Sequence, residues 1–457
     1  MYLKKIEVPG LAHYSYMIGS EGECAVIDPK RDVDEYLELA EFNGLRITHI
    51  FETHVHADFV SGARELAYHT GAGIYAGALG ELEFDHVPLK DGDQIKVGKI
   101  EIKALHTPGH TPEHICYLVH EEGNSGQPPI LFSGDTLFTG EVGRPDLLGE
   151  ETTEILARQL FQSLSQKLAR LDDHVQLLPG HGAGSLCGRH IANVASSTIG
   201  NERLTNYAFQ IKDEEEFVKL VTKDLPPAPP YFKRMKKINK QGPQILKQLP
   251  LLNILNPRDL VGRLDEYQLI DVRYSQYFGR GHLKNSYNIY VDASFSTWVG
   301  WLISPDKPII LIIDDYNVLD EAVRQLVRVG YENLAGFIQA DITLWQKLGL
   351  PIETLENITV ADLKALMKQK EDLLILDVRE RNEWASGRIP GAINIPLGFL
   401  NERLELLDPN RPTILVCASG FRSSAAASIL QQQGFKNIAN VIGGTNAWAS
   451  SKYELEK

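Results

Sequence analysis

The stretch Thr53–Phe59 carries two imidazoles and a carboxylate at alternating positions. It follows the largely apolar run 47–51, so we expect a buried strand to end there and a loop to begin. On such a loop His54, His56 and Asp58 can converge on a metal ion. Imidazole and carboxylate ligands suit zinc, iron or manganese. A lone pair of alternating histidines is a weak signal, so the interpretation depends on the residues downstream.

Four later segments supply further residues of the same types. They are His106–Thr111, Ser133–Asp135, Gly143–Asp146 and Pro179–Gly182. His110 and Asp135 follow strand-like runs, so they can meet the first motif at one edge of a sheet. His181 lies in the last segment. We expect Arg144, in the third, to pair with an anionic part of a substrate, with a structural salt bridge as the alternative.

A second reactive group lies near the end of the chain. Cys417 follows the apolar run 413–416 and precedes a helix that we expect to begin at about Ser423. The loop between them should turn its backbone N–H groups inward, and the helix N-terminus adds positive potential. Together with Arg422 these groups favour the thiolate, which is the nucleophilic form of cysteine, and stabilise a bound anionic persulfide.

The other three cysteines are weaker candidates. None forms a CxxC pair, so neither a disulfide framework nor a structural zinc knot is expected. Cys24 and Cys116 lie within apolar strands and are expected in the core. Cys187 lies in a glycine-rich stretch beside Arg189, where it is either a persulfide relay or a passive thiol.

The elements that must position these residues form several domains. A chain of 457 residues predicts about three. Residues 1–200 alternate short β-rich runs with helical stretches, which is typical of α/β domains, and a helical, proline-rich connector extends to residue 250. The segment 269–273 recurs as 375–379, which indicates two copies of one α/β unit, at 251–353 and 354–457.

Composition limits the possible partners. The hydrophobic fraction of 43% and the charged fraction of 23% are those of a globular protein. The formal net charge of -14 argues against a general nucleic-acid or anionic-membrane surface. The first residues lack an apolar targeting segment, and no run reaches the length of a membrane span. We therefore expect a cytoplasmic protein.

The order and spacing of the metal-binding segments resemble the metallo-β-lactamase superfamily, whose fold is an αββα sandwich. Its binuclear hydrolases, glyoxalase II among them, have a final histidine in the first motif where this chain has Phe59. That departure resembles the persulfide dioxygenase branch, which implies one Fe(II) per chain, with zinc as the alternative. The resemblance carries the ligand roles to His54, His110 and Asp135. The remaining members of the motifs either orient these ligands or keep a vestigial second metal site; they are His56, Asp58 and His181.

The Cys-x-x-Gly-x-Arg loop, which follows Asp377–Arg379, resembles the rhodanese family. Its six residues fit a sulfur-sized ligand, whereas phosphatases of the same fold have one residue more. The resemblance implies that Cys417 and Arg422 are catalytic. In the first copy Ile313 stands at the cysteine position and two aspartates follow, so that copy is predicted to be inactive.

The whole chain resembles bacterial fusions of a persulfide dioxygenase with a sulfurtransferase, which act in sulfide detoxification. The resemblance implies oxidation of a low-molecular-weight thiol persulfide by O₂ to sulfite, followed by transfer of sulfane sulfur from Cys417 to sulfite, giving thiosulfate. Glutathione and coenzyme A both remain possible as the thiol. We expect a homo-oligomer, with the inactive copy available for subunit contacts. The alternatives are a zinc-dependent thioester hydrolase of the glyoxalase II kind and a non-catalytic sulfur carrier or sensor.

Overall fold

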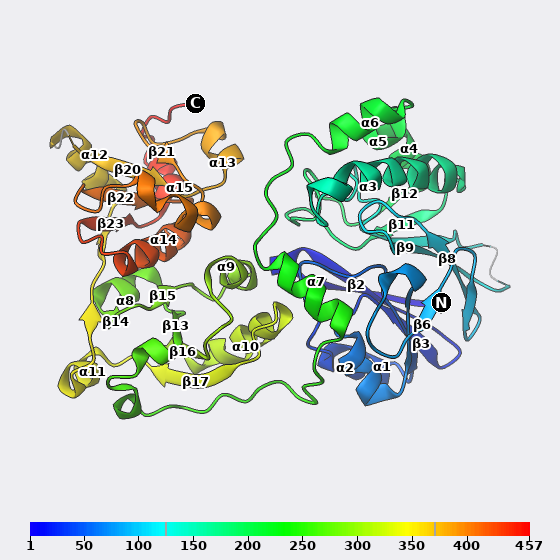
Figure 1. Ribbon diagram of the computed structural model, residues 1–457, viewed down its shortest axis with the longest axis horizontal. Coiled ribbons are helices and arrows are strands. Elements are labelled where there is room, and N and C mark those ends of the chain that lie inside the picture. Colours follow the sequence, from blue (N-terminus) through cyan, green and yellow to red (C-terminus); the bar gives the residue numbers. More distant parts are fainter. Residues whose placement is uncertain (124–125, 370–371) are drawn as a thin grey trace. The chain divides into compact units, whose positions relative to one another are not determined.

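The computed structural model describes residues 1–123, 126–369 and 372–457 (Figure 1). The chain forms two compact units. The first contains Met1–Leu249 together with Arg324–Gly330, and the second contains Pro250–Val323 together with Tyr331–Lys457. No helix among the described residues has both the length and the apolar character that a bilayer crossing requires.

Two six-stranded sheets form the centre of the first unit. In spatial order, the first sheet contains β1 (Tyr2–Val8), β2 (His13–Ser20), β3 (Glu23–Ile27), β4 (Arg46–Phe51), β5 (Gly73–Gly77) and β6 (Val87–Leu89). The second contains β12 (Ser197–Thr198), β11 (Gln176–Pro179), β10 (Ile130–Gly134), β9 (Ile115–Glu121), β8 (Ile100–His106) and β7 (Gln94–Val97). The strands that precede metal-motif loops include β4, β10 and β11, and β10 runs parallel to β11.

Apolar side chains from both sheets fill the space between them, including Ile18, Ala25 and Phe51 from the first and Ile102 and Tyr117 from the second. The outer face of the first sheet is covered by α1 (Asp34–Phe42) and α2 (Ala63–Thr70). The outer face of the second is covered by α3 (Glu150–Gln162), and Figure 1 shows these helices on opposite sides of the paired sheets. The predicted αββα sandwich is confirmed.

The segment after residue 198 folds onto this unit. It forms α4 (Ile199–Thr205), α5 (Tyr207–Gln210), α6 (Glu214–Val221) and α7 (Phe232–Gln241). Phe209 and Phe217 from this segment join the apolar cluster beneath α3. What looks like a connector in the sequence therefore contributes core side chains, because its apolar residues recur at helical spacing.

The second unit contains two parallel sheets. The first sheet comprises β15 (Tyr287–Asn288), β13 (Gln268–Asp271), β16 (Ile309–Ile313) and β17 (Leu334–Gln339). The second comprises β19 (Glu356–Ile358), β23 (Ile438–Val441), β22 (Thr413–Val416), β20 (Leu374–Asp377) and β21 (Ile393–Asn394). A short antiparallel pair joins β14 (His282–Leu283) to β18 (Ile352–Glu353).

Among the described residues, eight α-helices of the second unit accompany these sheets; they are α8 (Ser275–Arg280), α9 (Phe295–Leu302), α10 (Leu319–Arg328, whose C-terminal part belongs to the first unit), α11 (Ile342–Leu348), α12 (Val360–Gln369), α13 (Arg381–Ser386), α14 (Phe421–Gln432) and α15 (Gly444–Ser450).

The central strands of the two sheets pair in equivalent registers. Asp271 pairs with Ile312 in the first, and Asp377 pairs with Val416 in the second. Ile313 therefore occupies the place of Cys417, as the repeat in the sequence predicted.

Candidate active sites

Loops at the ends of β4, β8, β10 and β11 bring the predicted metal ligands together. His54 follows β4, His110 lies between β8 and β9, and Asp135 follows β10. Their ligand atoms all lie within 4.8 Å of one another, and each residue is buried. We refer to His54, His110 and Asp135 as the metal triad.

The metal triad has the geometry of an ion-binding site. The Nε2 atoms of His54 and His110 lie 3.8 and 3.5 Å from Oδ2 of Asp135. These three atoms are buried, and they find no hydrogen-bond partner among the described residues. Buried polar atoms normally have partners, so three orphaned ligand atoms that face one another fit a metal ion that all three bind.

The other polar atom of each triad residue is held by the protein. Nδ1 of His110 donates to the carbonyl of Arg144 at 2.8 Å, which leaves Nε2 with the lone pair. Nδ1 of His54 lies 2.9 Å from the Thr53 hydroxyl. Oδ1 of Asp135 accepts from Nδ1 of His181 at 2.7 Å. Such contacts orient ligands before a metal arrives.

The protonation states also suit a metal. Burial lowers the pKa of both triad histidines, which keeps their rings neutral. Burial alone would raise the pKa of Asp135, but the adjacent His181 and the triad histidines outweigh it and hold that pKa well below its usual range. Metal ligands must be deprotonated, and two neutral imidazoles with one carboxylate meet that condition.

His56 does not join the triad. Its Nε2 lies 3.1 Å from Oδ1 of Asp28 and 3.5 Å from Oε2 of Glu52. Burial opposes a charge on His56, but these two carboxyl groups outweigh it and raise its pKa to about 9. Burial likewise raises the pKa of Glu52 to about 8. His56 thus belongs to a separate buried acidic cluster behind the metal loop.

His181 bridges two carboxylates. Its Nδ1 bonds to Asp135 and its Nε2 bonds to Oδ2 of Asp58 at 2.8 Å. Burial opposes the charge, but the two carboxylates raise the pKa of His181 well above its ordinary value. That His181 and Asp58 orient a metal ligand, or instead keep a vestigial second metal site, stays a prediction. Cys187 lies with them in a second buried group whose ligand atoms are within 4.8 Å of one another.

The structure gives two of the predicted residues largely structural surroundings. The guanidinium of Arg144 bonds to both carboxylate oxygens of Asp146 at 2.7 Å and to the carbonyls of Leu186 and Pro226. The structural salt bridge anticipated for Arg144 is therefore the role its contacts support. Burial raises the pKa of Cys187 well above its ordinary value, with Asp58 and Asp135 adding to the rise. Those surroundings favour the passive thiol over the relay.

Helix α7 adds residues that the sequence did not point to. Asn239 donates to the carbonyls of His56 and Phe59 and accepts from the backbone N–H of Ser61, so α7 is fastened to the metal loop. One turn earlier, Nζ of Lys236 is buried and finds no hydrogen-bond partner among the described residues. The basic run 233–237 was the available signal, but its position after a proline-rich segment suggested a connector.

His114 is a second residue that the sequence did not point to. Its Nε2 accepts the backbone N–H of Asp135 at 3.0 Å, which fixes the start of the loop that carries the triad carboxylate. It lies four residues after His110, just beyond the segment His106–Thr111, and that proximity was the available signal.

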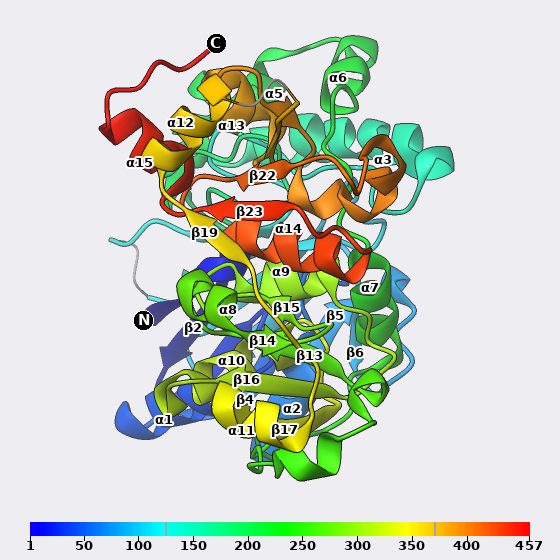
Figure 2. The ribbon, with the colours of Figure 1, turned by 90° about the vertical axis from the view of Figure 1, so that its left-hand side faces the viewer.

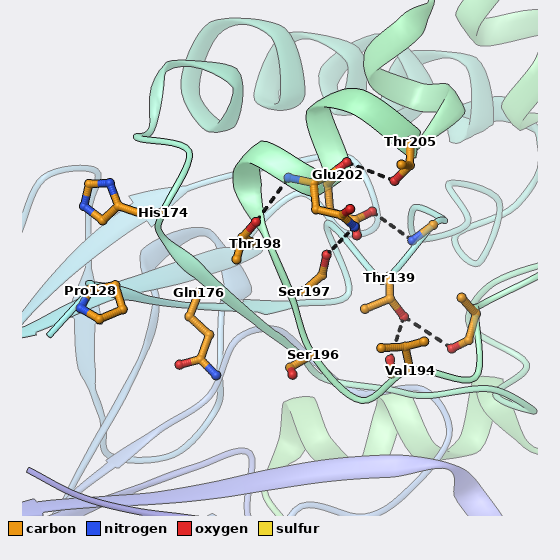
Figure 3. A pocket seen from close by; sticks show the side chains of 13 residues that line it. Pro128, Thr139, His174, Gln176, Val194, Ser196, Ser197, Thr198, Glu202 and Thr205 are labelled. Atoms are coloured by element: carbon orange, nitrogen blue, oxygen red, sulfur yellow. Dashed lines mark hydrogen bonds between the residues drawn. The ribbon is translucent and has the colours of Figure 1, made fainter.

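Two cavities of the first unit differ in their relation to the triad. A narrow one is lined by His54, Glu52, Arg64, Glu113 and Asn239, so it leads to the metal site. A wider hollow of about 620 Å³ lies at the β12 edge of the second sheet, next to α4 (Figure 3). Its lining is mainly neutral, and its buried Glu202 is already bonded to Gly140 and Asn206. None of its lining residues belongs to the triad, so we assign the chemistry to the narrow cavity.

The Cys417 loop, residues 417–422, comprises the four residues between β22 and α14 and the first two residues of α14, which begins at Phe421, earlier than the predicted start at about Ser423. The backbone N–H of Gly420 donates to Sγ of Cys417 at 3.0 Å, and the Ser423 hydroxyl lies 3.3 Å from the same sulfur. Gly420 has a φ of 102°, a conformation that favours glycine. The predicted inward-turned loop is therefore present around the thiol. Ser423 is an additional contact that the sequence motif did not identify.

Arg422 points its charge at a carboxylate. Its two terminal nitrogens donate to Glu383 at 2.6 and 2.7 Å, which joins the start of α14 to α13. Arg422 thus lies beside the Cys417 loop with its terminal nitrogens paired to Glu383.

Comparisons with known proteins agree with this architecture. Residues 8–181 match the family model of the metallo-beta-lactamase superfamily, and residues 256–348 and 359–451 match that of the rhodanese-like domain. A metallo-beta-lactamase structure from Staphylococcus aureus subsp. aureus COL is 36% identical, with a TM-score of 0.65; the match covers 75% of this chain and 99% of that one. The chain therefore belongs to the metallo-β-lactamase superfamily, and it continues into two rhodanese-like domains.

Curated relatives match part of the chain. A hydroxyacylglutathione hydrolase of Polaromonas sp. (strain JS666 / ATCC BAA-500) is 37% identical over 174 residues, which are 37% of this chain and 62% of that protein. A cytoplasmic hydroxyacylglutathione hydrolase of Arabidopsis thaliana is 35% identical over 184 residues, 39% of this chain and 67% of that protein. The chain thus spans less than two thirds of the Polaromonas relative. The fold and its cluster of histidine and aspartate side chains support a metal-dependent enzyme.

Proposed function

We propose that the first unit oxidises a low-molecular-weight thiol persulfide with O₂ to sulfite, and that Cys417 transfers sulfane sulfur to that sulfite to give thiosulfate. The overall first reaction converts a persulfide, O₂ and water into a thiol and sulfite. The observation that carries the proposal is a three-ligand metal site in the same chain as a thiol enclosed by sulfur-stabilising hydrogen bonds.

Iron is the metal that suits this site best. Two neutral imidazoles and one carboxylate leave open positions, the donor set used for non-haem iron. A bound Fe(II) would supply the redox chemistry with O₂ that zinc lacks. Phe59 supports one ion, because its apolar ring packs against His13 and His56 where the binuclear pattern has a ligand.

The residues of the first unit prepare a place for an anionic substrate. The persulfide group is acidic, and Lys236 brings an unpaired buried ammonium to the same region, where it acts electrostatically on His110, Glu113 and Cys187. Asn239 fastens this helix to the metal loop. Lys236 therefore attracts the anionic end of the persulfide, and the triad binds its metal next to it.

Sulfur transfer follows from the Cys417 loop. The thiolate attacks the outer sulfur of a persulfide, a new S–S bond forms, and the carrier thiol leaves with the proton. Sulfite then attacks the outer sulfur of the Cys417 persulfide, so thiosulfate leaves and the thiolate returns. The N–H of Gly420 stabilises the anionic sulfur at the start and end of this cycle, and the Ser423 hydroxyl, which also donates to Asn440, lies within reach of the same sulfur.

A second candidate is hydrolysis of a glutathione thioester by a zinc form of the first unit. The curated relatives carry the name hydroxyacylglutathione hydrolase. The group Asp58, His181 and Cys187 offers three ligand atoms for a second ion. Phe59 argues against this candidate, because it removes one ligand of the binuclear pattern.

The test is oxygen uptake by anaerobically iron-loaded protein, with glutathione persulfide and coenzyme A persulfide as alternative substrates. We expect uptake with thiosulfate as the product. His110→Ala should lower uptake at least about a hundredfold. Cys417→Ser should preserve uptake and change the product to sulfite, because only the transfer step needs the thiol.

Three outcomes separate the candidates. If Cys417→Ser takes up oxygen and still forms thiosulfate, the assignment of oxidation to the metal site and of sulfur transfer to Cys417 is contradicted. An absence of uptake from protein with one iron per chain contradicts the dioxygenase. Two zinc ions per chain with rapid thioester hydrolysis would establish the hydrolase instead.

A further inference from the structure

Helix α14, which begins at the Cys417 loop, has a run of eight buried residues, Ser423 to Leu430. A surface helix normally keeps a polar face for water, but this run consists of serine, alanine, isoleucine and leucine and carries no charge. Figures 1 and 2 both show α14 between its own sheet and β15 of the first rhodanese-like domain. We call that domain, which lacks the thiol, the vestigial repeat.

Asn288 of β15 forms a buried polar contact between the vestigial repeat and α14. Its Nδ2 donates to the carbonyls of Asp271 and Arg273, which aims Oδ1 the other way. That Oδ1 accepts the hydroxyl of Ser424, and the backbone N–H of Asn288 donates to Ser428. Asn288 and both serines are buried. Losing one partner would leave the others unsatisfied in the interior.

Tyr290 forms the second contact. Its ring stacks on Phe421 with centroids 5.0 Å apart and planes within 14°. Tyr274 also stacks on Tyr290 at 4.4 Å, lies 6.1 Å from Phe421, and accepts the Tyr290 hydroxyl at 2.8 Å. The three rings form one cluster, which holds Tyr290 against Phe421 next to Gly420.

Both contacts lie one residue from the groups that touch the reactive sulfur. Phe421 follows Gly420, whose N–H donates to Sγ of Cys417. Ser424 follows Ser423, whose hydroxyl lies 3.3 Å from the same atom. A displacement of Phe421 or Ser424 must therefore move a hydrogen-bond donor of the thiol. The active repeat holds the other side of this turn, where the Ser423 hydroxyl also donates to Oδ1 of Asn440 at 2.6 Å.

We propose that the vestigial repeat completes the sulfur-transfer site, with Asn288 and Tyr290 as positioning residues for Cys417. They hold the first turn of α14 so that Gly420 and Ser423 stay within reach of the sulfur. The inference rests on the sulfurtransferase part of the proposed function. It also assigns a role to a domain that has no cysteine at the position equivalent to Cys417.

The test compares full-length Tyr290→Ala, Tyr290→Phe and Asn288→Ala with the parent protein. Two quantities are measured: thiosulfate formation from glutathione persulfide and added sulfite, and the rate of Cys417 alkylation by iodoacetamide as a function of pH. Tyr290→Ala and Asn288→Ala should lower the transfer kcat about tenfold and move the midpoint of the alkylation profile to higher pH, because the thiolate loses its donors. Tyr290→Phe should retain most of the activity, since the stacking ring remains.

Matched controls separate positioning from general damage. Tyr316→Ala removes an exposed tyrosine of the same repeat that packs on Phe337, and Asn333→Ala removes an exposed asparagine. Both should behave like the parent. Oxygen uptake at the metal site should be unchanged in every variant.

The outcomes distinguish a failure of the proposed function from a failure of the positioning role. If the parent forms no thiosulfate, the proposed function fails. If the parent is active and Tyr290→Ala and Asn288→Ala keep its kcat and its alkylation profile, the positioning role is refuted. A lowered melting temperature with an unchanged alkylation profile also refutes it, because it shows stabilisation without control of the thiol.

Discussion

Lys236 places an ammonium group in a buried position without a counter-charge at hydrogen-bond distance among the described residues. Burial lowers the pKa of Lys236, against the opposing effect of Glu113 and Cys187. A buried charge is costly unless something pairs with it. An anionic substrate is the partner that would offset this cost, so Lys236 gains its partner when the site is occupied.

Lys236→Met should therefore raise the KM for the persulfide about tenfold, the loss expected for one hydrogen bond to a charged group. The kcat for oxygen uptake should change less, because the metal triad is intact. Lys237→Met is the control, since Lys237 is an exposed neighbour on the same helix. Equal KM values for the two variants would exclude a substrate contact by Lys236.

At the scale of residues, the sequence predicted which side chains lie at the site better than it predicted which groups they contact. His54, His110 and Asp135 lie together because each is close to a strand end, and strand ends are visible as apolar runs. The sequence did not show which way the His56 ring points, because its orientation depends on contacts with Asp28 and Glu52. The partners of Arg144 were likewise hidden, because the carbonyl of Pro226 is distant in sequence.

At the scale of elements, the first turn of α15 supports the residues that follow β22. Thr445 donates its backbone N–H to the carbonyl of Cys417 at 2.8 Å, and Asn446 donates to that of Ala418. Gly444 has a φ of 51°, and a Cβ there would lie 2.1 Å from the Cys417 oxygen. The turn thus needs glycine for two reasons, the backbone conformation and the close approach.

Gly444→Ala should destabilise the second unit by clearly more than the cost of the backbone conformation alone, which is about 1–2 kcal/mol. Gly391→Ala is the matched control: its φ is 74°, and nothing lies within 4 Å of the added Cβ. Urea unfolding followed by tryptophan fluorescence measures both variants. Equal midpoints would show that the close approach to Cys417 is relieved without cost.

The elements themselves were predictable where periodicity and loop chemistry agree. The repeat placed β16 and β22 in equivalent positions, and the paired registers of the two sheets bear this out. Helix α7 was not predicted as part of the metal site. Its docking depends on Asn239, whose partners belong to the loop 56–61. No local pattern shows a contact made across so long a stretch of chain.

At the scale of the molecule, the fusion provides the two proposed active sites in equal numbers. Sulfite made by one unit is consumed by the other, so each chain carries one source and one acceptor. Nothing in this arrangement requires the same chain to perform both steps, because sulfite is small and diffuses in water. The fusion raises its local concentration rather than creating a new contact.

A mixture of His110→Ala and Cys417→Ser chains should therefore form thiosulfate. Its rate should be lower than that of the parent at equal site concentration, and the difference should shrink as total protein rises. Timed assays of thiosulfate across a dilution series measure this. A mixture that accumulates sulfite without forming thiosulfate would show that transfer requires both intact sites in one chain.

The burial of α14 has a consequence for how this chain can change. Ser424 and Ser428 of this helix bond to Asn288 of the vestigial repeat while the helix also packs on its own sheet, so a gain in volume there must be absorbed by both domains. The vestigial repeat therefore carries a packing constraint although it lacks the thiol. Its neighbours on α14 tie the sequences of the two copies to each other, and drift in one is limited by what the other can accommodate.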